Sequence, residues 1–501
     1  MSIGVIITMN KKIVLVLSCV LLLIITSSVT SSSSNKLTIN DFDPLVDIEV
    51  TVKIDTIRYL EDETSDSTQA ISNARNRFKL FLEYIRWQLH KNDISDEKPS
   101  MYVKVLINDV EFTSPVYSNS YYVYDANVTA TLNVPDDVEF VDITIQLWQQ
   151  RDEGDRLLDI SPNEGKYEAN MTYSIATGHW TGDDYLGDPS GYGRLNGCDD
   201  RSVYKNEGDC EIWFDIFQNT YDGSGIPYWM QVYVYGIDPM ENNTGIDYNG
   251  NGIPLKWEWK WGYDPFEYID HTILDASGDA ISNYEKYLTR EYGSDPFRKE
   301  VFVQMDVMDE GPNGEITQFP PDGIELLKTA FNRQNIVIHI DTSRTVPFYE
   351  ELSYSQIRSL YQDFFIIDEE ERWREDVFHY GLIIYDVTEG TPAGFAFRRN
   401  AFVVVSQAME EYYKSPFLSS REVIYASAFM HELGHTFGFW PIPGHNRRSI
   451  YPWQILYWQN LPYNSCMNYG WMYVIVDYSD GSGVVPDLND WQRISYSYFK
   501  S

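Results

Sequence analysis

The chain has 501 residues, of which 43% are hydrophobic and 15% aromatic, and its formal net charge is −37. The length predicts two to four domains, and this apolar content is sufficient for packed cores and too high for a disordered protein. Because no basic patch offsets the negative charge, nucleic acid is excluded as a partner, whereas calcium ions and a solvated extracellular surface suit such a charge.

Residues 1–30 have the organisation of a secretory signal peptide. Lys11 and Lys12 precede an apolar run over 13–25, and small Thr and Ser residues follow that run. The run is short for a membrane span, so we expect a secreted, extracellular protein. Retention of the segment as an uncleaved N-terminal anchor is the alternative. Residues 31–45 are Ser-rich and are expected to form a linker.

Residues 46–218 have the patterning of β-strands. Apolar and polar residues alternate over 48–54, 102–106 and 143–148, and another strand is expected over 127–134. One helix is expected within this region, over 74–90. Strands in this number, with few helices, predict an antiparallel β-sandwich.

Part of this region, residues 100–159, resembles a C2-type sandwich. It contains Tyr-Val-Lys-Val, an Asn-Asp turn, Thr-Ser-Pro, and a strand that ends in Gln-Leu-Trp before an acidic loop. The resemblance implies calcium binding by Asp152, Glu153 and Asp155 of that loop, and contact of the sandwich with a cell or membrane surface. A solvated acidic turn in a plain sandwich is the alternative.

Two cysteines lie close together in a polar loop. Export would permit a disulfide bond between Cys198 and Cys210, whereas Cys466 is expected to be a buried free thiol. Glycosylation is a further expectation of export, and Asn-x-Thr triplets occur at Asn127, Asn170 and Asn242.

Three similar segments, about 27 residues apart, occupy residues 219–297. Each begins with an oxygen-rich loop and continues into a short helix. The middle loop supplies the ligands that calcium requires, in the order of an EF-hand-type loop. Its positions 1, 3, 5, 7 and 12 are Asp247, Asn249, Asn251, Ile253 (by its carbonyl) and Glu258.

The other two loops are poorer in oxygen ligands. The third is expected to be a partial calcium site of Asp275, Ser277, Asp279, the carbonyl of Ile281, and Glu285. Its position 12 is Lys286, and Glu285 stands one residue early. The first loop has little charge and is expected to be vestigial, with Thr220, Asp222, Ser224 and Gln231. Together the segments resemble the thrombospondin type-3-like calcium repeats of secreted proteins, which implies a calcium-stiffened linker.

Residues 298–501 alternate strands and helices. Strands are expected over 301–306, 335–340, 380–387 and 401–406, and a helix over 321–334. A further helix is expected over 423–437, after a capping box formed by Ser419 and Glu422. This order predicts an α/β domain with a mixed sheet.

The last of these helices contains His431-Glu432-x-x-His435. Residues i and i+4 share one face of a helix, so both imidazoles can bind one metal ion. Glu432 can take a proton from a metal-bound water. The alternative is a buried helix whose histidines only form hydrogen bonds.

Two motifs together carry a family resemblance. His431-Glu432-x-x-His435-x-x-Gly438 and the later Ser465-Cys466-Met467-Asn468-Tyr469 resemble metzincin zinc peptidases with an astacin-like Met-turn. The whole layout is similar to secreted archaeal peptidases with an upstream sandwich and a calcium linker. The resemblance implies a zincin fold, a Zn²⁺ cofactor, Met467 as an apolar floor under the metal, and Tyr469 as a weak ligand or a donor to the oxyanion.

The third metal ligand departs from the metzincin pattern, which has a histidine where this chain has Pro441. The nearest candidate is His445, seven residues after Gly438, and an extended segment of that length spans roughly 20 Å. Asn446 or Tyr469 as the third ligand, and a degraded site, are the alternatives.

The sequence therefore predicts a multidomain protein with an N-terminal C2-like β-sandwich, a calcium-binding linker and a metzincin-like α/β zincin domain. The expected function is secreted zinc endopeptidase, acting on protein or peptide substrates with Glu432 as general base. The alternative is a non-enzymatic extracellular calcium-binding or adhesion protein with a degraded peptidase domain. Substrate preference and oligomeric state stay open.

Overall fold

The computed structural model describes residues 48–60, 98–135, 138–183, 193–203, 207–366, 372–388, 390, 392–415 and 419–500. The expected signal peptide, the Ser-rich linker and the expected helix over 74–90 lie outside these residues. Within the described part of the chain, no helix combines the length and the apolar composition that crossing a bilayer requires.

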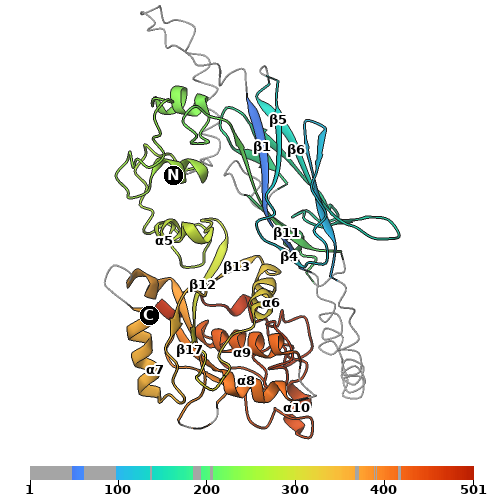
Figure 1. Cartoon of the computed structure of the whole chain (residues 1–501), viewed down its shortest axis with the longest axis vertical. Coiled ribbons are helices and arrows are strands. Elements are labelled where there is room, and N and C mark those ends of the chain that lie inside the picture. Colours follow the sequence, from blue (N-terminus) through green and yellow to red (C-terminus); the bar gives the residue numbers. More distant parts are fainter. Residues whose placement is uncertain are drawn as a thin grey trace, which may run out of the picture. The chain divides into compact units, whose positions relative to one another are not determined.

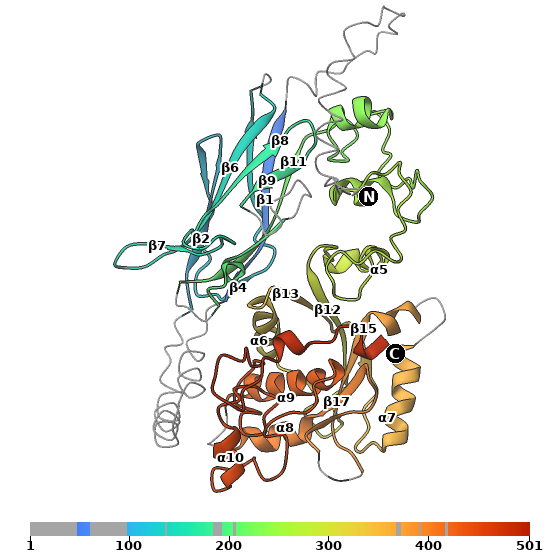
Figure 2. The same cartoon turned by 180° about the vertical axis from the view of Figure 1, so that it is seen from behind.

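The N-terminal strands form two antiparallel sheets (Figures 1 and 2). Their bounds are β1 (Glu49–Tyr59), β2 (Met101–Ile107), β3 (Val110–Thr113), β4 (Tyr122–Val123), β5 (Val128–Asn133), β6 (Phe140–Gln149), β7 (Arg156–Leu158), β8 (Ala169–Ser174), β9 (Trp180–Gly182), β10 (Arg194–Asn196) and β11 (Cys210–Gln218). One sheet has the order β10-β11-β1-β4, with β5 also paired to β1, and the other has the order β3-β2-β6-β8-β9, with β7 paired to β6.

One hydrophobic core lies between these two sheets. Alternate residues of β1 are completely buried, namely Val50, Val52 and Ile54, and Val103 and Val105 of β2 are buried in the same way. Since successive side chains of a strand point to opposite faces, each sheet presents one apolar face to the other. The predicted antiparallel β-sandwich is confirmed.

The three repeats between residues 219 and 297 each pair a loop with a short helix. The helices are the π-helical η2 (Met230–Tyr235), α4 (Leu255–Lys260) and α5 (Asn283–Leu288), with the 3₁₀ turn η3 (Arg290–Tyr292) after the last. Small aromatic cores hold them together. Ile253 packs with Trp257 and Trp261, whereas Ile226 packs with Leu255 and Trp259.

The C-terminal region is built on a mixed sheet of the order β13-β12-β15-β17-β16, with β14 paired to β12. Its elements are β12 (Lys299–Met308), α6 (Pro321–Asn332), β13 (Ile336–Asp341), β14 (Thr345–Val346), α7 (Tyr354–Leu360), η4 (Tyr361–Phe365), η5 (Arg372–Asp376), β15 (Phe378–Ile384), β16 (Gly394–Ala396), β17 (Ala401–Val405), α8 (Ser406–Tyr413), α9 (Arg421–Thr436), α10 (Ile455–Asn460), η6 (Trp491–Arg493) and η7 (Tyr498–Lys500). All pairs are parallel except that of β16 with β17.

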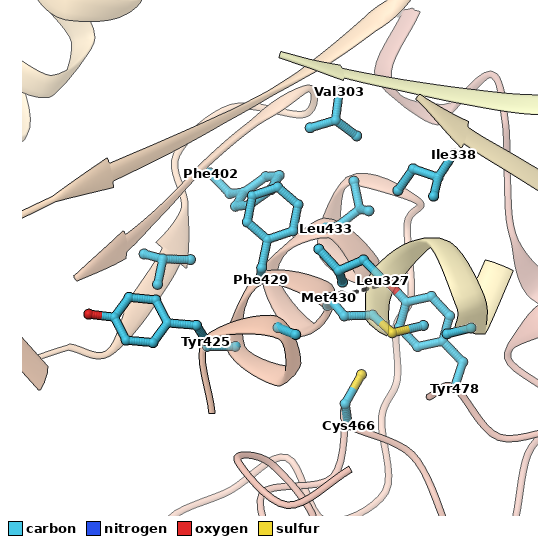
Figure 3. Packing of buried hydrophobic residues seen from close by; sticks show 14 of the residues in the cluster. Val303, Leu327, Ile338, Phe402, Tyr425, Phe429, Met430, Leu433, Cys466 and Tyr478 are labelled. Carbon is cyan, nitrogen blue, oxygen red and sulfur yellow. Dashed lines mark hydrogen bonds between the residues drawn. The ribbon is translucent and has the colours of Figure 1, made fainter. Parts of the chain in front are cut away.

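Helices cover this sheet, and the covered strands are apolar along their whole length. Every residue of β15 and β17 is buried, which is typical of parallel strands with both faces covered. On one face, α9 inserts Phe429 and Leu433 towards Phe402 of β17 (Figure 3). This packing fixes the helix that carries the His-Glu-x-x-His motif against the sheet.

Helix α9 begins at Arg421, two residues before the predicted start at 423, and the predicted N-cap, Ser419, is one residue too early. The N-cap residue is Ser420, and no side chain caps the helix there. Ser419 donates its hydroxyl to the carbonyl of Val474 at 3.2 Å, so the capping box with Glu422 does not form. The competing tertiary hydrogen bond explains the difference.

The predicted disulfide bond was wrong, because Cys198 and Cys210 are separate buried thiols. The Cys198 thiol faces a carboxylate oxygen of Asp209 at 3.5 Å, and the Cys210 thiol faces the carbonyl of Gly208 at 3.4 Å. Each sulfur therefore has its own polar neighbour. The prediction for Cys466, a buried free thiol, is confirmed.

Candidate metal centre

Helix α9 buries its motif residues against the domain core. His431 is 1% exposed and Glu432 is 4% exposed, while His435, one turn later, is partly exposed. The rings of the two histidines lie 5.1 Å apart between centroids. Because the apolar side of α9 faces the sheet, both imidazoles occupy the remaining face of the same helical turn.

A backbone carbonyl selects the tautomer of His431. Its Nδ1 lies 2.8 Å from the carbonyl oxygen of Cys466, so this nitrogen carries the proton and Nε2 keeps its lone pair. Burial, helped by the neighbouring imidazoles, lowers the pKa of His431 well below its usual range and that of His435 to about 4. Both side chains are therefore neutral at pH 7, which is the form that binds metal ions.

The third histidine of the group is His445. Its Nε2 lies 3.2 Å from Nε2 of His431, and the ligand nitrogens of the three histidines all lie within 4.8 Å of one another. Asn446 does not join them, because its side-chain oxygen accepts the backbone N–H of Arg448 at 3.0 Å. Of the ligands weighed for this position, the structure brings His445 to the group, although Pro441 occupies the position that the metzincin pattern gives to histidine.

Two glycines allow the chain to reach this point. Gly438 ends α9 at φ +80°, and Gly444 has φ +74° immediately before His445. A Cβ atom on Gly444 would clash with the side-chain oxygen of Asn468. Asn468 is itself fixed, since its amide donates to the carbonyls of Asn460 and Tyr463 at 2.9 and 3.0 Å. The loop that carries His445 is therefore seated on the segment around Met467.

Met467 and Tyr469 both lie at the histidine group. Met467 is completely buried, and a Cβ atom on Gly434 would lie 2.5 Å from its sulfur, so it packs against α9 at Gly434, which immediately precedes His435. The Tyr469 ring lies 4.3 Å from the His445 ring and 5.6 Å from the His431 ring. Burial raises the pKa of Tyr469, so its hydroxyl keeps its proton and can donate it.

The carboxylate of Glu432 is buried without a full set of partners. Within the described residues its Oε2 has no hydrogen-bond partner, and burial raises its pKa to about 8. A Cβ atom on Gly394 would lie 2.8 Å from Oε1, so the backbone of the edge strand β16 passes close to this carboxylate. A buried carboxylate without partners is costly unless a positive charge or a donor joins it.

These residues fit a catalytic zinc ion. Such an ion takes three protein ligands and leaves one position open for water or substrate. Three imidazoles with clustered nitrogens would supply the ligands, and the unpartnered oxygen of Glu432 is the group that a metal-bound water would satisfy.

Sequence reasoning missed a buried carboxylate behind the Met467 segment. Asp490 is completely buried and accepts the hydroxyls of Tyr463 at 2.5 Å and Ser465 at 2.7 Å, while Arg493 lies 3.2 Å from its other oxygen. Ser465 precedes Cys466, whose carbonyl orients His431. Asp490 lies 59 residues after His431 in a segment without a motif, so no sequence signal pointed to it.

We predict that Asp490→Ala weakens zinc binding by about 10- to 100-fold, the range typical of residues that orient metal ligands. The change leaves the hydroxyls of Tyr463 and Ser465 without their acceptor, which frees the Cys466 carbonyl to move. Competition with a chromophoric chelator measures the affinity. Asp487→Ala is the matched control, since Asp487 accepts from Ser479 and Gly483 instead. Equal weakening in both variants would contradict a specific role for Asp490.

In the middle repeat, the structure brings together Asn249, Asn251 and Glu258, three of the five predicted calcium ligands. Glu258 is completely buried, and both of its oxygens face the side-chain amide of Asn249, at 3.0 and 3.2 Å, while Asn251 lies 2.8 Å away. In the third repeat, Glu285 instead forms a capping box with Ser282.

In the sandwich, Asp155 accepts the Tyr102 hydroxyl at 2.8 Å, and among the described residues its carboxylate does not form a metal-ligand group with Asp152 and Glu153.

A second group of acidic side chains lies in the sandwich, at Asp159, Asp200 and Glu207, with carboxylate oxygens within 4.8 Å of one another. Burial, together with the nearby carboxylates, raises the pKa of Asp159 to about 8. Protonation of Asp159 relieves the repulsion, so the group is stable without a cation, and we assign no ligand to it.

Comparison with known proteins adds little to the description of the fold and the site. No family model matches the chain, and no curated protein matches it. Among solved structures, it is similar to a C2 domain (9% identity, 34% of this chain and 98% of that chain, TM-score 0.18) and to a C2 domain of plant Extended Synaptotagmin 1 (11%, 34% and 94%, 0.18). It is also similar to human GIVD cytosolic phospholipase A2 (10%, 36% and 18%, 0.19), so it spans under a fifth of that protein. These TM-scores are too low to support a conclusion about the fold. The β-sandwich is identified instead from its two sheets and from the core that they share.

Proposed function

We propose that this protein is a secreted zinc-dependent endopeptidase with a metzincin-like C-terminal domain. The observation that carries the proposal is the convergence of His431, His435 and His445 beside the buried carboxylate of Glu432. Met467, which packs against Gly434 of α9, and Tyr469, whose ring lies 4.3 Å from that of His445, add support, because the resemblance to metzincins implies that both residues lie near the metal.

The roles of the residues follow from their chemistry. The three imidazoles would hold the zinc ion, which when bound would supply Lewis-acid chemistry to a water molecule and to the carbonyl of the substrate. Glu432 accepts the proton of that water and then delivers it to the leaving amine. Tyr469, which keeps its proton, donates its hydroxyl to the carbonyl oxygen as negative charge develops there.

An extended peptide can be positioned by the edge strand β16. This strand pairs only with β17 among the described strands, so its outer edge offers backbone donors and acceptors. Its Gly394 lies against Glu432. A substrate added to this edge as a further strand would pass the general base with its backbone in a fixed direction.

We also propose that the middle repeat binds calcium through Asp247, Asn249, Asn251, the carbonyl of Ile253, and Glu258. The completely buried carboxylate of Glu258 supports this, because within the described residues it has no Lys or Arg partner and lies 3.3 Å from the imidazole of His271. Calcium at this loop would stiffen the linker and take no part in hydrolysis.

Hydrolysis of a mixed peptide library by the purified chain tests the peptidase proposal. The purified chain is expected to bind one zinc ion and to cleave peptides. A chelator should abolish this activity, and added zinc should restore it. His435→Ala removes one ligand and should abolish both zinc binding and cleavage. His339→Gln is the control, because His339 contacts Glu300 outside the histidine group.

The same experiment separates the proposal from its rival. A chain that binds no zinc and cleaves no peptide at neutral pH would contradict the peptidase proposal and favour the extracellular binding protein. Zinc binding that survives in His435→Ala would contradict the assignment of the ligands.

A further inference from the structure

The three loops of the linker share one backbone conformation. The N–H at position 7 donates to the side chain at position 5 in each loop, at 3.0, 2.9 and 3.0 Å. The N–H at position 6 donates to the side chain at position 1, namely from Gly225 to Thr220 (3.2 Å), from Gly252 to Asp247 (2.8 Å) and from Ala280 to Asp275 (2.8 Å). Position 6 has positive φ in all three, even where it is Ala280. The loops therefore differ in their side chains and not in their fold.

Position 12 is where they differ most. It is Gln231 in the first loop, Glu258 in the middle loop and Lys286 in the third. Each of these side chains is buried and turns back onto its own loop. In the middle loop, the position-12 carboxylate adds negative charge to a ring of oxygen ligands, and a cation is needed to balance it.

In the third loop, the residue at position 12 is itself positively charged, so no metal cation is needed to balance the carboxylates. The Lys286 ammonium is completely buried, and it donates to Asp279 at position 5 (2.6 Å) and to Glu300 of β12 (2.7 Å). Its third hydrogen bond goes to the carbonyl of Arg298 at 3.0 Å. All three donors of the ammonium are used, so the group is fully satisfied without a metal ion.

The charges around Lys286 also favour its ionised form. Burial alone would lower its pKa, but the carboxylates of Glu300 and Asp279 raise it overall. An ammonium in contact with the position-5 carboxylate repels calcium and blocks one of the ligands that calcium would need.

In the first loop, an amide nitrogen occupies the corresponding place. Nε2 of Gln231 donates to the carbonyl of Ile226 at position 7 (2.8 Å) and approaches the side chains of Ser224 at position 5 (3.3 Å) and Asp222 at position 3 (3.4 Å). These are the groups that would ligate calcium in an EF-hand-type loop. Gln231 is 1% exposed, so its amide is shielded from bulk solvent.

We propose that the linker takes one calcium ion, in the middle repeat, and that a side-chain nitrogen from position 12 replaces calcium in the two flanking repeats. Lys286 replaces it as a cation, and Gln231 replaces it as an uncharged donor. The inference on the flanking repeats stands on their own contacts, whereas the single site rests on the calcium proposal for Glu258. The linker would then combine one calcium-dependent repeat with two that fold without metal.

Calcium stoichiometry of the zinc-loaded chain, measured by equilibrium dialysis, tests this proposal. Asp222→Asn and Asp275→Asn each remove a carboxylate ligand from a flanking loop, and both should keep the wild-type calcium count. Glu258→Gln should lose one calcium ion. Gln231→Glu places a carboxylate at position 12 of the first loop and should gain one. Far-ultraviolet circular dichroism checks that each variant is folded.

The outcomes distinguish the two proposals. Loss of a calcium ion in Asp222→Asn or Asp275→Asn overturns the assignment of that flanking repeat, whatever Glu258→Gln does. An unchanged count in Glu258→Gln overturns the middle site, while unchanged counts in the two Asp variants still support metal-free flanking repeats. Calcium bound elsewhere in the chain appears equally in all variants and does not affect these differences.

Discussion

Glu432→Gln is expected to lower kcat by about 10²- to 10⁴-fold, the contribution typical of a general base, while zinc stays bound. Glutamine has the shape of glutamate but cannot accept the proton of the attacking water. The variant keeps all three histidines. Among the described residues, one oxygen of the buried Glu432 carboxylate has no partner, so its replacement by an uncharged amide should not destabilise the fold. Because the base must be ionised, the wild-type rate should rise with pH as Glu432 loses its proton, and the variant should lack this rise.

Steady-state peptide hydrolysis across pH 5–9, with zinc content measured on the same samples, checks this result. Glu422→Gln is the matched control, since Glu422 lies in the first turn of the same helix and away from the histidines. A Glu432→Gln protein that keeps more than a tenth of wild-type activity would show that another group is the base. Loss of zinc along with activity would mean that Glu432 holds the metal site together.

Lys286→Met is expected to destabilise the chain by about 3–5 kcal/mol, as is typical when one partner of a buried ion pair is removed. Methionine matches the size of the lysine stem but leaves Asp279 and Glu300 as two carboxylates close together and buried. Their pKa values in the folded variant must then rise above those of the unfolded chain. The variant's stability is therefore highest at acidic pH and is lost as the pH rises through these raised pKa values.

Guanidinium unfolding at pH 4.5 and pH 7.5, followed by tryptophan fluorescence, measures both the loss and its pH dependence. Lys414→Met is the control, because Lys414 pairs with Glu411 at the same 2.6 Å but on the surface, where such a pair contributes little. A deficit that is equal at the two pH values would contradict the role of the two carboxylates. A deficit no larger than that of the control would contradict the buried ion pairs themselves.

Local patterns predicted the features that depend on neighbouring residues. Alternation identified the strands of the sandwich, and the spacing of His431 and His435 placed both on one face of a helix. The turn chemistry of the three repeats was also visible, because its hydrogen bonds join positions 6 and 1 and positions 7 and 5 of the same loop.

Features that depend on distant residues could not be predicted. In the sequence, Lys286 at position 12 indicated only that the calcium ligand of that position is missing. No residue near it in the sequence indicates that its ammonium binds Glu300 of β12. The spacing of Cys198 and Cys210 suggested a disulfide bond, but Asp209 provides a polar neighbour for the Cys198 thiol instead. Asp490 lies far along the chain from the histidine that it helps to orient, and only the folded structure connects them.

The loop between Gly438 and His445 affects how relatives of this chain can be found. A search pattern that fixes the last histidine three residues after the glycine rejects this sequence at Pro441, although the imidazole nitrogens of all three histidines lie together. Gly444 is seated against Asn468, Ile442 packs against the domain core, and Arg493 donates to the carbonyl of Pro441 at 3.2 Å. The path of the loop, and not a fixed number of residues, brings His445 to the other two histidines. A pattern with a variable gap there, followed by Gly-His and a later Ser-x-Met-Asn-Tyr, would recover chains that a fixed spacing leaves unassigned.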